Sequence, residues 1–63
     1  MPWIICKIED SQEELLTDDR DNVIVFRQFQ QALTYVRTNF IRRFKIRYIK
    51  KKSELGNRKT VDY

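Results

Sequence analysis

Apolar residues recur with a helical period between residues 28 and 38. They fall at i, i+3, i+4, i+7 and i+11 and so form one stripe on a helix: Phe29, Ala32, Leu33, Val36 and Phe40. The other side is polar, and Asn39 can adopt the left-handed backbone that often ends a helix. The start has no strong N-cap residue, because neither Arg27 nor Gln28 is of that type. The pattern predicts one amphipathic helix.

Two segments have the pattern of strands. Residues 3–8 are short, β-branched and apolar on both faces, which favours an interior place in a sheet, with Ile4, Cys6 and Ile8 on one face and Trp3 and Ile5 on the other. Residues 41–51 alternate strictly between two sides. One side, facing the helix, is largely apolar (Phe44, Ile46, Tyr48), and the other is basic (Arg43, Lys45, Arg47).

Residues 11–22 allow two interpretations. Ser11 to Glu14 satisfies the capping-box pattern of a helix start, whereas Asp18 to Asn22 is typical of a turn. Only two leucines could anchor a helix there, and so short a helix is weak alone. We favour a hairpin in which residues 22–26 return as a strand beside residues 3–8.

The expected order is strand, strand, helix, strand. This predicts an α+β fold, a small two-layer β-β-α-β domain with one amphipathic helix packed on a three-stranded or four-stranded sheet. Residues 1–52 form the single domain, and residues 53–63 contain a turn followed by either a short strand or a flexible tail. A right-handed crossover would place residues 3–8 in the middle, antiparallel to residues 41–51.

The composition narrows what can hold the fold together. The chain has 63 residues, 41% of them hydrophobic, which makes one small domain of modest stability. One cysteine and no histidine allow neither an internal disulfide nor a Cys/His zinc site. Cys6 shares a face with Ile4 and Ile8, so we expect a buried structural thiol.

Charge is distributed unevenly. The net charge is +4, yet residues 1–21 sum to −5 and residues 22–63 to +9. Such a dipolar chain could steer toward an anionic partner, or its two halves could pair and largely cancel. The longest apolar stretch, residues 3–6, is too short for a signal peptide or a membrane span. Together with an unpaired thiol, this indicates a cytoplasmic protein that does not bind membranes.

No residue pattern indicates catalysis. Histidine is absent, there is no nucleophile–base pair, and a single glycine cannot build a phosphate-binding loop. The acidic residues between 9 and 21 fit no metal-binding loop. We therefore expect no enzyme activity, no metal and no cofactor.

A partner-binding face is the remaining candidate. Alternate strand residues lie about 6.6 Å apart, so the cations of residues 43–47 would form a line continued by Lys50, Lys51 and Lys52. Trp3 and Ile5 would adjoin this line on the sheet face away from the helix and would offer an aromatic anchor. The alternatives are an edge strand protected by its charges, or a Trp3 covered by the tail or by a second copy in a homodimer.

Two functions follow from this face. The first is a small regulatory or inhibitory module that docks on a larger protein with an acidic surface. The small size of the chain would also suit a phage-encoded regulator. The second is nucleic-acid binding, with phosphates along the basic strand 42–52. The second has weaker support, because Phe44 and Tyr48 lie on the side that faces the helix.

Overall fold

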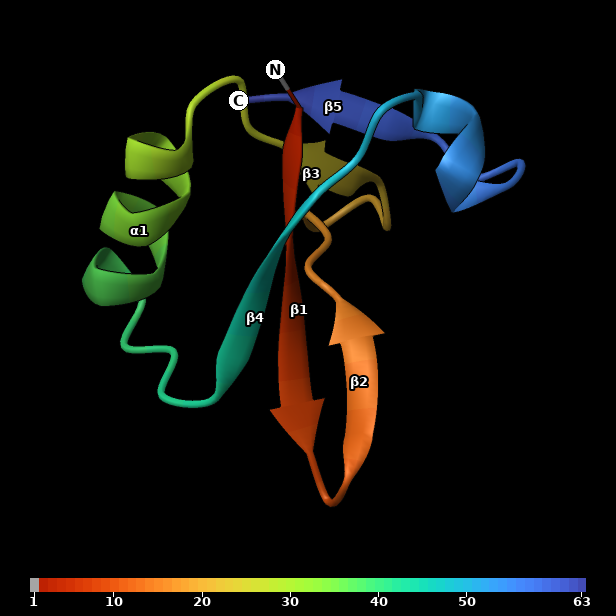
Figure 1. Ribbon diagram of the computed structural model, residues 1–63. Coiled ribbons are helices and arrows are strands. Elements are labelled where there is room, and N and C mark those ends of the chain that lie inside the picture. The colour runs from red at the N-terminus through yellow and green to blue at the C-terminus, as the bar shows by residue number, and fades with distance from the viewer. Residues whose placement is uncertain (1) are drawn as a thin grey trace.

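The computed structural model describes residues 2–63. Its elements in chain order are β1 (Trp3–Glu9), β2 (Gln12–Leu15), β3 (Val23–Val25), α1 (Phe29–Thr38), β4 (Phe44–Tyr48), a 3-10 helix η1 (Lys52–Leu55) and β5 (Thr60–Asp62). Helix α1 packs beside an antiparallel sheet ordered β2-β1-β4, and β3 and β5 form a second, parallel sheet (Figure 1). The α+β class and the central place of residues 3–8 are confirmed. So is the antiparallel pairing of β1 with β4.

Strand β1 turns directly into β2. The two-residue turn, Asp10 and Ser11, has φ values of 49° and 67°, and positive φ at both positions is typical of the type I′ turn that suits hairpin twist. Two expectations for this segment, the helix start and the strand that completes the hairpin with β1, are therefore wrong. Residues 11–14 start no helix, and the strand returning beside the end of β1 is β2. Only Leu15 in β2 is apolar, so alternation gave no strand signal there.

Residues 22–26 are extended but have another partner. Strand β3 runs parallel to β5, with Val23 opposite Thr60 and Val25 opposite Asp62. It reaches β1 through a single bridge, in which the Trp3 and Phe26 backbones exchange hydrogen bonds of 2.7 and 2.8 Å. For the C-terminal segment, the structure has the short strand at residues 60–62 and not the loose tail.

Strand β1 contributes side chains to two hydrophobic cores, one on each of its faces. On the helix side, Ile5, Phe26, Ala32 and Val36 are buried together, with Phe44 and Ile46 among the side chains packed against them. On the other side, the buried set is Ile4, Cys6, Val23, Val25 and Ile49. The second sheet therefore covers part of the sheet face that points away from the helix, which was expected to stay open. Both cores are possible because β1 is apolar on both faces.

The ends of α1 differ from expectation in one respect. Gln28 occupies the N-cap without a side-chain hydrogen bond, as the sequence predicts. The backbone of Asn39 is not left-handed, since its φ is −98°. Its side-chain amide donates a hydrogen bond to the Tyr35 carbonyl at 2.9 Å. Phe40 takes the left-handed position instead, with φ 55°. Its side chain leaves the predicted buried stripe and is 88% exposed.

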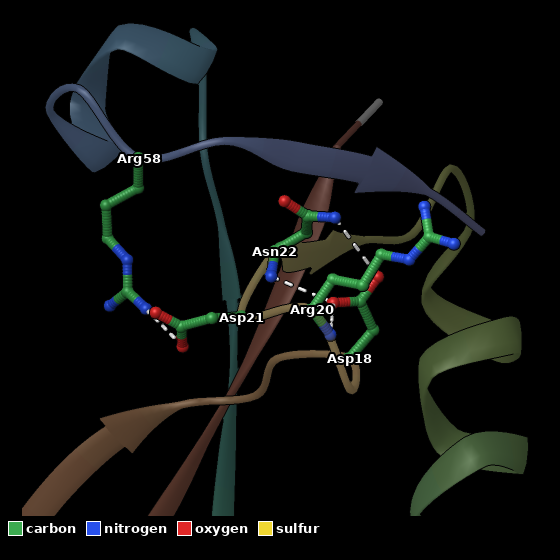
Figure 2. A network of polar contacts seen from close by, with 5 residues as sticks. All are labelled: Asp18, Arg20, Asp21, Asn22 and Arg58. Carbon is green, nitrogen blue, oxygen red and sulfur yellow. Dashed lines mark hydrogen bonds and ion pairs between the residues drawn. The ribbon is translucent and has the colours of Figure 1, made fainter.

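A polar network organises the connection from β2 to β3 (Figure 2). One carboxylate oxygen of Asp18 accepts from the N–H groups of Arg20 at 2.9 Å and Asn22 at 2.8 Å. Asp21 has φ 64° and pairs with Arg58 at 3.5 Å. This confirms the turn predicted at residues 18–22 and ties it to the segment that leads into β5.

Two carboxylates make the stability of the fold depend on pH. The Asn22 backbone N–H chiefly lowers the pKa of Asp18, and the Lys51 and Lys50 backbone N–H groups lower the pKa of Glu54. A group whose pKa is lower in the folded chain stabilises the fold above its unfolded pKa, and that stabilisation is lost as the pH falls through the folded pKa. We therefore expect the melting temperature to drop as the pH falls from about 5 to about 2.

Thermal unfolding followed by circular dichroism at several pH values measures this effect. The matched control is the double variant Asp18→Asn, Glu54→Gln, which keeps an acceptor oxygen at each position and removes the titration. Its melting temperature should fall less over the same pH interval. An equal fall in both proteins would contradict the assignment.

Candidate interaction surface

Strand β4 carries the basic face that the sequence predicts. The strand is extended over Phe44–Tyr48, shorter than the predicted 41–51. Phe44 and Ile46 pack on the helix side, so Lys45 and Arg47 point to the opposite face and are exposed. Arg43, just before the strand, continues the alternation. We call Arg43, Lys45 and Arg47 the basic row.

One member of the basic row is partly neutralised. Lys45 Nζ lies 3.1 Å from Glu13 Oε1, and both side chains are about half exposed. The pair spans β1, because Lys45 lies opposite Cys6 and Glu13 opposite Ile8. With the pair of Asp21 and Arg58, it links the acidic and basic halves of the chain. Exposed pairs of this kind contribute little to stability.

Trp3 and Ile5 lie on the other face, so the prediction that they adjoin the basic row is wrong. Ile5 is opposite Ile46 and Trp3 is opposite Tyr48, and opposite residues in an antiparallel pair share a face. Ile5 is fully buried. The Trp3 ring packs edge-on against Phe29 and Tyr48, with centroids 5.1 and 5.3 Å away. Apolar residues on both faces of β1 hid which face the helix covers.

Lys50, Lys51 and Lys52 do not continue the row along the strand, which also corrects the prediction. The strand ends at Tyr48, and Ile49 is buried in the second core. The chain then bends into η1, where the Glu54 carboxylate accepts the N–H groups of Lys50 and Lys51. Lys52 Nζ pairs with Asp62 at 3.1 Å.

A hollow between the end of β1 and the α1–β4 loop is the feature that sequence reasoning missed. Its volume is about 480 Å³. We call it the loop hollow. It is lined by three cations, one acid and a largely apolar wall: Lys7, Arg42, Arg43, Glu9, Ile8, Phe40 and Ile41. The helical spacing of Phe40 assigned it to the core, and only Asn39, a residue that can end a helix just before it, could have argued against that.

The loop hollow combines an exposed ring with uncompensated positive charge. Phe40 is the most exposed of the large hydrophobic residues among residues 2–63. Among the described residues, 2–63, no acidic side chain lies within ion-pair distance of Lys7, Arg42 or Arg43. Arg43 belongs to both the loop hollow and the basic row, so the two surfaces are continuous. They suit an anionic partner that also presents apolar or planar groups.

The remaining candidate reactive group, the Cys6 thiol, is buried. Cys6 is 2% exposed within the second core, which confirms its predicted burial. Among residues 2–63, acids and the cysteine nowhere form a group of three that could hold a metal ion. Over the same residues, no helix has the length and apolar character needed to cross a membrane.

Comparison with protein-family models, with curated protein sequences and with solved structures gives no match. The functional argument therefore rests on the basic row and the loop hollow.

Proposed function

We propose that this protein is a small non-enzymatic regulatory or inhibitory module that binds an acidic surface of a larger protein. The observation that carries the proposal is the exposed Phe40 ring in the cationic loop hollow, next to the basic row. Aromatic and arginine side chains contribute much of the binding energy at protein interfaces. Unpaired cations around such an anchor favour a partner of opposite charge.

The acids on this surface favour a protein over a phosphate backbone. Glu13 pairs with the central cation of the basic row, and Glu9 lines the loop hollow. A nucleic-acid strand would carry phosphates past both carboxylates, which repel them. A protein can place neutral groups at those positions and acids only where Arg42, Arg43 and Arg47 require them.

Nucleic-acid binding is the second candidate, and Phe40 favours it. An exposed ring flanked by Arg42 and Arg43 can stack on a base while the arginines contact neighbouring phosphates. This removes the objection that Phe44 and Tyr48 face the helix. The basic row would then follow the strand backbone.

Titration with two defined probes separates the candidates. The probes are a glutamate-rich peptide of about 20 residues and a deoxythymidine oligonucleotide of equal charge, each at two salt concentrations. We expect the peptide to bind more tightly. Binding of the oligonucleotide alone, with log affinity falling by about 0.7 per phosphate contact against log salt, would establish the nucleic-acid function instead.

The variant Phe40→Ser should weaken peptide binding about 10-fold to 30-fold, because it removes the aromatic anchor, worth about 1.5 to 2 kcal/mol. Phe40→Tyr retains the ring and should bind nearly as well as the original chain. The thermal unfolding of both variants should be close to that of the parent, since the side chain is exposed. Unchanged affinity in Phe40→Ser would remove Phe40 from the site.

A further inference from the structure

Strand β4 is an edge of the antiparallel sheet, and one side of its backbone has no partner among residues 2–63. Two hydrogen bonds set the phase of its pairing: Ile8 N–H donates to the Arg43 carbonyl at 3.1 Å, and Ile49 N–H donates to the Pro2 carbonyl at 3.0 Å. Hydrogen-bonding groups alternate in direction along an antiparallel strand. The backbone N–H and C=O groups of the odd-numbered residues of β4 therefore point toward β1. Those of the even-numbered residues point outward, away from the sheet: Phe44, Ile46 and Tyr48.

The two faces of this open edge differ in chemistry. Lys45 and Arg47 are exposed cations on one face, while Ile46 is half-buried and Tyr48 is 41% exposed on the other. A strand added to the edge would continue both faces, whichever direction it runs. Its residues beside the cations are best acidic, and the alternate ones, beside Ile46 and Tyr48, are best apolar.

We propose that the open edge of β4 binds an extended segment of the partner protein in which acidic and apolar residues alternate. This inference rests on the proposed function and adds the conformation and sequence pattern of the partner. Backbone hydrogen bonds to residues 44, 46 and 48 supply affinity, and the alternating side chains supply specificity. Arg43 then leads the bound segment toward the loop hollow and Phe40.

A second copy of this chain fits the edge poorly. In a two-fold antiparallel pair of β4 strands centred on Ile46, Lys45 of one copy lies opposite Arg47 of the other. Centred on Lys45, the pair places Arg43 opposite Arg47. Like charges directly opposite each other destabilise a sheet. The cations that guard the edge against self-pairing thus select an acidic strand.

Amide hydrogen exchange of the full, ¹⁵N-labelled chain tests this inference. The probe is a synthetic peptide of alternating glutamate and valine. In the chain alone, the amides of residues 44, 46 and 48 should exchange fast, and those of Lys45 and Arg47 slowly. With the peptide, the three outward amides should slow at least about tenfold. The same peptide N-methylated at alternate residues along its pairing edge should lose this protection.

The outcomes separate the inference from the proposed function. If the peptide binds in a Phe40-dependent way and the outward amides stay fast, the edge is not the site while the interaction function stands. If the alternating peptide does not bind while the glutamate-rich peptide does, the inference fails and the proposed function stands; if neither peptide binds, both fail. Protection by the oligonucleotide, or protection that rises with protein concentration in the absence of peptide, would assign the edge to nucleic acid or to a second copy and overturn the inference.

Discussion

Phe26→Ala should remove about 3 to 5 kcal/mol of unfolding free energy, the usual cost of truncating a buried phenylalanine. Phe26 is fully buried, and its ring lies 5.4 Å from that of Tyr35 and 4.9 Å from that of Tyr63. It thus joins the start of β1, helix α1 and the C-terminal residue. A domain of this size has about 3 to 9 kcal/mol in total, so most of the stability would be lost.

Urea denaturation followed by tryptophan fluorescence measures this loss, because Trp3 bridges Phe26 through the backbone. The matched control is Phe40→Ala, the same change at an 88% exposed position. It should alter the unfolding free energy by no more than about 0.5 kcal/mol. A large loss in the control, or a small one at Phe26, would contradict the placement of these two rings.

Reversing the basic row should weaken binding of the acidic peptide about 100-fold. The variant is Arg43→Glu, Lys45→Glu, Arg47→Glu. Each substitution removes an attraction and adds a repulsion, which together cost about 1 kcal/mol of binding free energy at an exposed site. The three substitutions therefore cost about 3 kcal/mol, which corresponds to a little over 100-fold in affinity. The fold should persist, because these side chains lie outside both cores.

The control for the reversal keeps the total charge and changes its location. Arg20, Arg37 and Lys59 are exposed and lie outside the basic row and the loop hollow. Their reversal to Glu lowers the net charge by the same six units. It should weaken binding only slightly, through long-range attraction that salt screens. Equal losses in the two variants at physiological salt would mean that net charge, and not the basic row, governs binding.

Local patterns predicted the elements whose signal is self-contained. The period of residues 29–36 predicted α1, and the alternation of residues 43–49 predicted which side chains of β4 face the helix. Asp18 and Asn22 predicted a turn through side-chain chemistry that operates within five residues. Strand β2 escaped notice because its stability comes from pairing with β1, and its own side chains are mostly polar and exposed.

The candidate site was predicted in part. The basic row was expected, since alternation along one strand is enough to place its cations on one face. The loop hollow was not, because it forms where the end of β1 meets the loop after α1, and no local pattern reports that encounter. Trp3 and Ile5 were misplaced because either face of β1 could have received the helix.

By itself, the sequence determined the α+β class, the helix, the central strand, the buried thiol and the alternation of β4, all of which follow from side-chain periodicity over a few residues. Tertiary structure alone decided which face of β1 meets α1, that β3 pairs with β5, and that Val23 and Val25 of β3 join the second core. It also decided that Phe40 stands in solvent among arginines. These depend on contacts between segments far apart in the chain, whose energies no local pattern records.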